Sequence, residues 1–192
     1  MSALMDALQS GFGVETDVRD FAGNLVISHD LATSHSLSLN DFLEAYHKVG
    51  GHLALNIKAD GLCEILFQQL KQYDVTNYFV FDMSVPEMYR YSERGLKYFT
   101  RQSDLEESPI LLPKATGIWV DTFEHDWINF AVLSDYLSQG KSLGIVSPEL
   151  HGHPYQLTWQ RYREFFNQLR THGNKILLCT DHPQEAKEFF DA

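Results

Sequence analysis

The chain of 192 residues is long enough for one substantial hydrophobic core and short for two independent domains, so we expect a single domain. Its 44% hydrophobic and 13% aromatic residues are typical of a packed globular protein and exclude a disordered one. The formal net charge of -11 argues against nucleic acid or an anionic membrane surface as the main partner, because the protein repels phosphate backbones.

Short β-branched or aromatic runs alternate along the chain with amphipathic segments of helical period, which is typical of parallel βα units. Residues 21–24, Phe-Ala-Gly-Asn, have the composition of a tight turn, which predicts one bent strand or a hairpin there. The pattern gives about seven βα units, against the eight of a closed (β/α) barrel. The predicted strands are 13–19, 25–29, 53–58, 78–83, 98–101, 118–121, 143–147 and 175–180.

Helices are predicted between these strands. Ser38 caps the second helix, with Asp41 in its first turn, and the glycines at 50 and 51 can end it. Pro86 and Pro183 stand in favourable first-turn positions. Two prolines in residues 105–116 favour a loop with a short helical turn. The predicted helices are 2–10, 39–49, 62–73, 86–94, 127–138, 159–171 and 183–190.

The two cysteines, Cys63 and Cys179, lie within apolar segments. This favours buried thiols in a reducing compartment over a secreted disulfide scaffold. Residues 1–11 lack a basic region followed by an apolar core, and no apolar run reaches the length of a membrane span. We therefore expect a cytoplasmic protein without membrane insertion.

Polar side chains stand near the carboxyl end of nearly every predicted strand. In a (β/α) barrel these ends meet on one face, where active sites form, so the pattern predicts a single site. The polar residues are Glu15, Asp17, His29, Asp30, Asn56, Lys58, Asp82, Arg101, Asp121, Glu149, His151 and Asp181.

Glu15 and Asp17 are two positions apart on a strand, so both side chains point to the same face. Adjacent carboxylates repel unless one is protonated or a cation lies between them, and Mg²⁺ and Ca²⁺ take such oxygen ligands. The pair predicts a divalent cation site. The alternative is two solvated acids on an edge strand.

His29 and Lys58 each end an apolar run, and Asn56 shares the strand face of Lys58. An imidazole can donate or accept a proton near neutral pH, and a lysine ammonium can neutralise a phosphoryl oxygen. These residue types therefore suit phosphate-ester chemistry. The alternatives are a surface histidine and a solvated lysine.

Further residues are predicted to line a substrate pocket, namely Arg101, Asp121, Glu149 and His151. Arg101 is either a phosphate contact or an ion-pair partner of Asp82 or Asp104. His151 and His153 share a compact loop, but a zinc site is not favoured because no cysteine or further histidine lies nearby.

Residues 11–20, Gly-Phe-Gly-Val-Glu-Thr-Asp-Val-Arg-Asp, and 23–30, Gly-Asn-Leu-Val-Ile-Ser-His-Asp, closely resemble the glycerophosphodiester phosphodiesterase family. That family pairs a Glu-x-Asp strand with a His-Asp that follows a short turn, and the motif is fairly specific. Residues 55–58, Leu-Asn-Ile-Lys, are similar to the family's next strand, which ends in Glu-x-Lys. The βα pattern extends the resemblance loosely to the C-terminus.

The resemblance implies a TIM-type (β/α) barrel that holds Mg²⁺ or Ca²⁺, and it implies a role in lipid metabolism. The implied reaction cleaves a small phosphodiester to an alcohol and a phosphomonoester such as glycerol 3-phosphate. Glu15, Asp17 and, more weakly, Asn56 would be metal ligands, His29 a general acid or base, and Lys58 a phosphate contact.

Two features depart from the family pattern. The family's opening strand with His-Arg-Gly has no counterpart upstream, so we expect an incomplete barrel whose open edge could form a homo-oligomer. Asn56 stands where the family usually has a metal-binding Glu, which lowers the site charge by one. The sequence thus predicts a metal-dependent phosphodiester hydrolase, impaired in this form, with a non-catalytic phosphate- or sugar-phosphate-binding protein as the alternative.

Overall fold

A computed structural model describes residues 1–169 and 176–191 of the chain. The chain divides into two compact units, Met1–Phe99 and Thr100–Ala192, which we call the N-terminal and the C-terminal unit. The expected single folding domain stays a prediction.

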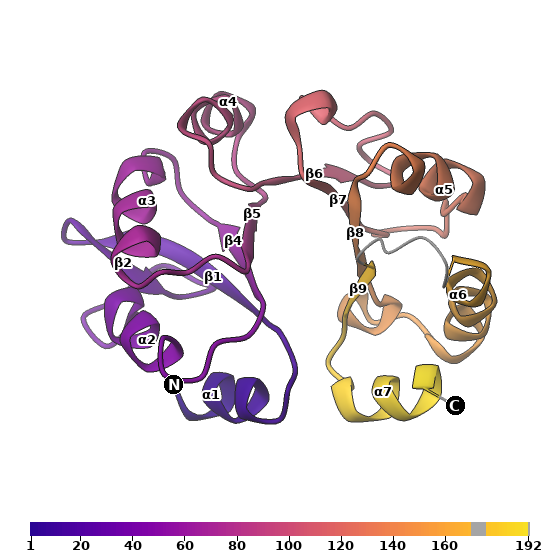
Figure 1. Cartoon of the computed structure of the whole chain (residues 1–192), viewed down its shortest axis with the longest axis horizontal. Coiled ribbons are helices and arrows are strands. Elements are labelled where there is room, and N and C mark those ends of the chain that lie inside the picture. The colour runs from indigo at the N-terminus through magenta and orange to yellow at the C-terminus, as the bar shows by residue number, and fades with distance from the viewer. Residues whose placement is uncertain (170–175, 192) are drawn as a thin grey trace. The chain divides into compact units, whose positions relative to one another are not determined.

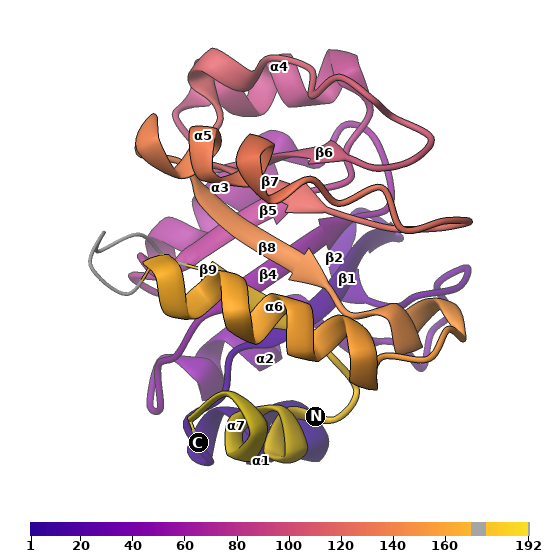
Figure 2. The same ribbon diagram turned by 90° about the vertical axis from the view of Figure 1, so that its right-hand side faces the viewer.

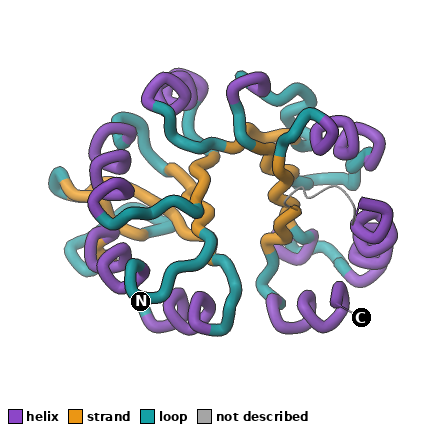
Figure 3. The backbone as a smooth tube through the Cα atoms, viewed as in Figure 1, coloured by secondary structure: helices purple, strands orange, loops and turns teal. Residues whose placement is uncertain are grey.

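The N-terminal unit is built on a sheet with the strand order β3-β2-β1-β4-β5. β1 pairs with β4 and β4 with β5 in parallel, whereas β2 returns antiparallel to β1. The strands are orange and the helices purple in Figure 3. The turn between β1 and β2 has positive φ angles at both central residues, Ala22 (50°) and Gly23 (80°), as two-residue hairpins require. Of the two predicted alternatives, the hairpin is therefore confirmed. The strands are β1 (Val14–Phe21), β2 (Asn24–Ile27), β3 (Leu37–Ser38), β4 (Leu53–Ile57) and β5 (Tyr78–Phe81).

The two faces of this sheet differ in chemistry. Asp17 pairs with Asn56, and Asn56 pairs with Phe81, so these side chains share one face. The other face carries the fully buried Val18 and Leu55 and packs under helices (Figure 1). The helices of the unit are α1 (Ser2–Gln9), α2 (Leu39–Tyr46), α3 (Cys63–Gln72) and α4 (Val85–Arg94).

Local signals in the sequence account for the ends of α2. The Ser38 hydroxyl accepts a hydrogen bond from the Asp41 amide at 3.3 Å, as predicted. The helix ends at Tyr46, before the predicted 49, and the chain then turns through Gly51, whose φ is +126°. The positive φ favours glycine at this position, and a Cβ atom there would lie 2.5 Å from Cδ2 of Leu8 in α1, so the Leu8 side chain would have to shift.

The C-terminal unit is built on a sheet with the order β6-β7-β8-β9, in which β7, β8 and β9 are parallel. The predicted loop at 105–116 contains one short 3₁₀ helix, as expected. Position 175 of the last predicted strand and positions 170–171 of the sixth helix lie outside the described residues. The elements are β6 (Phe99–Gln102), η1 (Leu112–Lys114), β7 (Gly117–Val120), α5 (Phe130–Ser138), β8 (Ser142–Val146), η2 (Pro148–His151), α6 (Gln156–Leu169), β9 (Ile176–Cys179) and α7 (Pro183–Asp191).

The core of this unit lies between its strands and the helices α5 and α6, and α6 runs alongside β8 and β9 (Figures 1 and 2). α6 contributes Trp159, Tyr162 and Phe165, and the strands contribute Ile118 and Ile145. Full burial of each such side chain stabilises the fold by roughly 1.5–3 kcal/mol. These three aromatic side chains thus anchor α6 in the core of the unit.

The described residues contain as many strands of the βα pattern as the sequence predicts units, namely β1, β4, β5, β6, β7, β8 and β9. β2 completes a hairpin with β1, and β3 is an additional short strand. The α/β class with parallel sheets is confirmed. Cys63 is buried, as expected, but Cys179 is only half-buried. Among the helices in the described part of the chain, none combines the length and the apolar composition needed to cross a membrane.

Candidate functional site

Five polar side chains gather on one face of the N-terminal sheet at the level where β4 and β5 end. We call this set the acidic cluster, and it consists of Glu15, Asp17, Asn56, Lys58 and Asp82. Lys58 Nζ lies 3.2 Å from Asp17 Oδ1, and the Asn56 amide donates to Asp82 Oδ2 at 3.2 Å. Asn56 pairs in the sheet with Asp17, and Glu15 is two positions before Asp17 on the same strand face. The structure therefore brings together four of the predicted site residues and adds Asp82.

Glu15 is the deepest member of the acidic cluster, since it pairs with Ala54 while Asp17 pairs with Asn56 nearer the strand end. Burial raises the pKa of Glu15 from 4.5 to about 7. The nearby carboxylates of Asp17 and Asp82 raise it as well, while the Lys58 ammonium opposes them. Without a cation, Glu15 therefore holds a proton up to near-neutral pH.

The Asn56 side chain has an oxygen atom that accepts no hydrogen bond. Only 8% of the residue is exposed, and its Oδ1 atom is buried without a hydrogen-bond partner. An unsatisfied buried oxygen costs about 1–3 kcal/mol, so it needs an explanation. An oxygen of this kind beside two carboxylates is a ligand that Mg²⁺ and Ca²⁺ accept, so these residues fit a divalent cation.

His29 reaches the level of the acidic cluster through the hairpin rather than at the end of a parallel strand. The Ser28 amide donates to the Asp17 carbonyl at 3.1 Å, which sets the backbone of His29 beside β1. The imidazole is 77% exposed, and its Nδ1 lies 3.1 Å from Asp30 Oδ1. β2 is antiparallel to β1, as the predicted hairpin requires, so His29 follows the return strand of that hairpin.

Arg19 was not predicted as a site residue. Its guanidinium donates to the His29 carbonyl at 3.2 and 3.3 Å and to the Lys58 carbonyl at 3.4 Å. It thus ties together the two segments that carry the predicted proton-transfer residue and the predicted phosphate contact. The only signal in the sequence is that Arg19 lies two positions after Asp17, on the same strand face.

In the C-terminal unit, two of the other predicted residues, His151 and Arg101, lie beside the ring of Phe123, and a third, Asp121, contacts His151. His151 Nε2 lies 2.7 Å from Asp121 Oδ1, and its ring lies 4.9 Å from that of Phe123. The Arg101 guanidinium lies 5.4 Å from the centroid of the same ring. Arg101 forms an ion pair with Glu106, an acid that the sequence-based prediction did not name.

Both carboxylate oxygens of Glu149 accept hydrogen bonds, one from the Ser147 hydroxyl and one from the Thr180 hydroxyl. Trp159 Nε1 donates to the same Ser147 oxygen at 2.7 Å. This network braces the ends of β8 and β9. The predicted contact of Glu149 with substrate stays a prediction.

A second acidic group, Asp104, Glu124 and His125, has ligand atoms within 4.8 Å of one another. Asp104 accepts backbone hydrogen bonds from Phe123, Glu124 and His125, so its carboxylate already braces that loop. Nearby, His153 Nε2 lies 3.0 Å from the Phe123 carbonyl oxygen. The backbone hydrogen bonds to Asp104 account for the position of its carboxylate in this loop.

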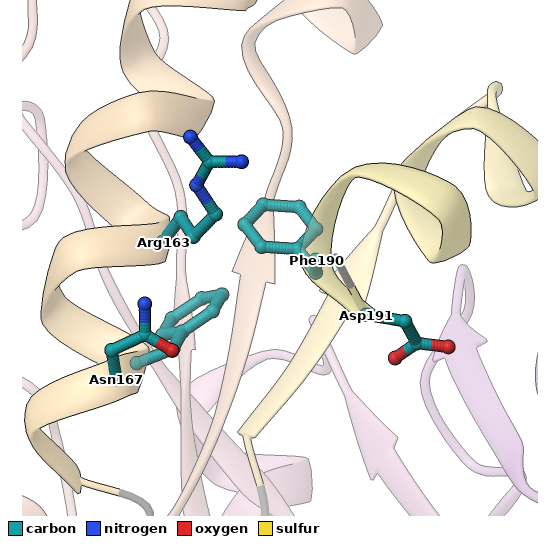
Figure 4. Close-up of a pocket in the computed structure, with 5 residues that line it drawn as sticks. Arg163, Asn167, Phe190 and Asp191 are labelled. Carbon is teal, nitrogen blue, oxygen red and sulfur yellow. The ribbon is translucent and has the colours of Figure 1, made fainter.

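The C-terminal unit also has a pocket of about 490 Å³ between α6 and α7 (Figure 4). Arg163, Asn167, Phe190 and Asp191 line it, together with Phe166. The Arg163 guanidinium lies 4.4 Å from the ring of Phe189, where it packs against α7. None of the predicted site residues lines this pocket.

Solved structures match this chain by their fold, whereas the comparisons by sequence found no match. No family model and no curated protein matches the chain. A candidate glycerophosphodiester phosphodiesterase from Galdieria sulphuraria is 12% identical, with a TM-score of 0.73, over 100% of this chain and 90% of its own. Glycerophosphodiester phosphodiesterase from Agrobacterium tumefaciens is 14% identical, with a TM-score of 0.62, over 92% of this chain and 88% of its own.

Glycerophosphoryl diester phosphodiesterase from Parabacteroides distasonis is 13% identical, with a TM-score of 0.60, over 95% of this chain and 76% of its own. At such identities the likeness concerns the fold, and it agrees with the resemblance that the Glu-x-Asp and His-Asp motifs indicate. The chain therefore has the TIM-type α/β fold of the glycerophosphodiester phosphodiesterases.

Proposed function

We propose that this protein is a metal-dependent phosphodiester hydrolase that releases an alcohol and a phosphomonoester such as glycerol 3-phosphate. The observation that carries the proposal is the acidic cluster, where two carboxylates, an unpartnered amide oxygen and a lysine meet. The likeness of fold to glycerophosphodiester phosphodiesterases supports the reaction class.

Glu15, Asp17 and the Oδ1 atom of Asn56 would hold the cation, Mg²⁺ or Ca²⁺. A bound divalent cation neutralises negative charge on phosphoryl oxygens. The carboxylates alone cannot bind an anionic phosphodiester because they repel it. A cation must therefore bind to the acidic cluster before a substrate does.

Lys58 and His29 would act on the substrate. Lys58 supplies a positive charge beside Asp17 and can neutralise a phosphoryl oxygen. Hydrolysis adds water across one P–O bond, so a proton leaves the water and the departing alkoxide takes one up. His29, near the acidic cluster through the hairpin and hydrogen-bonded to Asp30, can carry one of these protons. Arg19 positions both segments.

Substrate-binding residues are also proposed in the C-terminal unit, namely Arg101, Asp121, Glu149 and His151. The aromatic ring of Phe123 beside His151 and Arg101 gives this group an apolar surface as well as charge. A cytoplasmic location and association into a homo-oligomer are part of the same proposal. The buried Cys63 thiol agrees with a reducing compartment.

The alternative is a protein that binds phosphate or sugar phosphate without turnover. Asn56 favours it, because an amide in place of a carboxylate weakens cation binding, and so does the exposure of the His29 ring.

The test is to assay the full-length natural protein for glycerol 3-phosphate release from glycerophosphodiesters with Mg²⁺ or Ca²⁺. Hydrolysis that disappears in Glu15→Gln supports the hydrolase. Calorimetric binding of glycerol 3-phosphate without hydrolysis supports the alternative. If the protein is inert and Glu15→Gln changes neither turnover nor binding, both fail.

A further inference from the structure

We propose that Asp82 supplies the cation site with the carboxylate that Asn56 lacks, so that the acidic ligand stands at the end of β5 instead of on β4. This inference rests on the proposed cation site in the acidic cluster. It assigns a ligand role to a residue outside the predicted metal set of Glu15, Asp17 and Asn56.

The first support is the position of Asp82 beside Asn56. Asn56 pairs in the sheet with Phe81, and Asp82 is the next residue. The Asn56 amide donates to Asp82 Oδ2 at 3.2 Å, and Asn56 pairs in the sheet with Asp17 on its other side. Glu15 is two positions before Asp17 on the same strand face, so Asn56 connects Asp82 to the face that carries both carboxylates.

The second support is the Asn56 Oδ1 atom, which is buried without a partner in a residue that is 8% exposed. The amide nitrogen donates to the Asp82 carboxylate, so the oxygen remains for an electron-pair acceptor. A divalent cation satisfies this oxygen and offsets the repulsion between the carboxylates of Glu15, Asp17 and Asp82.

The third support is the backbone of Asp82, whose φ is +65°. Non-glycine residues adopt this left-handed region rarely, at a cost of roughly 1–2 kcal/mol, and Asp and Asn tolerate it best. Glycine would suit the turn better on conformational grounds. A carboxylate at such a position is therefore explained by what the side chain does.

The charges of the acidic cluster agree with the inference. Glu15, Asp17 and Asp82 contribute three negative charges when ionised, and Lys58 contributes one positive charge, which leaves a net charge of −2. Without Asp82 the net charge would be −1. A site for a divalent cation is better matched by the first value.

The experiment is calorimetric titration of the full-length protein with CaCl₂ and with MgCl₂. Asp82→Asn keeps the left-handed backbone and removes the charge, so it should weaken binding at least about tenfold. The matched control is Asp20→Asn, on the opposite face of β1, which should bind like the wild type. Thermal melting of both variants without metal shows that each remains folded.

A double-mutant cycle with Asn56→Ala separates a ligand from a residue that acts through Asn56. If Asp82 is a ligand, Asp82→Asn weakens Ca²⁺ binding in the Asn56→Ala background as well. An Asp82→Asn effect that vanishes in that background, or no effect at all, overturns the inference.

The outcomes for Asp82 and for the proposed function are distinct. If Glu15→Gln loses Ca²⁺ binding and Asp82→Asn does not, the cation site is supported and the role of Asp82 is refuted. Binding that depends on Asp82, in a protein that hydrolyses nothing, supports that role and refutes the hydrolase. A wild-type protein that binds neither ion refutes both.

Discussion

The Nζ atom of Lys58 lies 3.2 Å from Oδ1 of Asp17, so the proposed phosphate contact is paired with a proposed metal ligand. Both side chains are largely buried, and the pair is therefore less screened by salt than a surface ion pair. Each residue limits the charge that the other presents to a ligand.

Replacing Lys58 with methionine should move the two kinds of binding in opposite directions. Ca²⁺ should bind more tightly, because Asp17 loses its competing ammonium, and glycerol 3-phosphate should bind more weakly. Calorimetric titrations with each ligand measure this, with Lys71→Met on α3 as the control. A variant that weakens both ligands alike would instead point to a structural role for Lys58.

Arg19 should hold the segments of His29 and Lys58 in position, with little effect on the stability of the whole fold. Arg19→Met removes its hydrogen bonds to two backbone carbonyls. We expect faster hydrogen exchange of the amides at 28–30 and 58–61, with the melting temperature changed little. If turnover is found, kcat should fall more than KM rises. Unchanged exchange in both segments would contradict the positioning role.

The buried Glu15 carboxyl should give the metal-free protein a pH-dependent stability. Its pKa is raised from 4.5 to about 7, so between these values the folded state binds the proton that the unfolded state has released. The free energy of unfolding should therefore fall as pH rises through this window, by up to about 3 kcal/mol.

Urea denaturation in EDTA at pH 4.5 and pH 7.5 tests this stability change. Glu15→Gln should reduce the difference between the two pH values, and Glu44→Gln on the exposed face of α2 should not. Saturating Ca²⁺ should restore stability at pH 7.5, because a ligand that binds only the folded state stabilises it. An equal pH dependence in wild type and Glu15→Gln would refute the assignment.

Core substitutions in each unit test the predicted single domain. Phe42 in α2 is fully buried, and Trp159 in α6 is 1% exposed, so replacing either with alanine should cost roughly 3–5 kcal/mol. In one cooperative domain, both substitutions lower the same calorimetric transition. Two transitions, each lowered by one substitution only, would show that the units fold separately.

The boundaries of the elements show which signals act locally. The Ser38 cap and the hairpin turn at Ala22 and Gly23 depend on neighbouring residues, and the structure confirms both. The predicted start of α5 at 127 was wrong. Asn129 caps the helix by accepting from the Ala131 amide at 3.0 Å, so α5 begins at Phe130. The Trp127 indole instead donates to the Asp121 carbonyl at 2.6 Å.

The sequence by itself determined the motif residues Glu15, Asp17, His29 and Lys58 and the order of βα units, because strand periodicity and turn chemistry are properties of adjacent residues. Only the tertiary structure decided that Arg19 joins Lys58 and that Asn56 joins Asp82. The first pair is 39 positions apart and the second 26, so their contacts exist only once parallel strands align in register. Spacing along a chain carries no information about that register, and the acidic cluster therefore takes its composition from the sequence and its geometry from the fold.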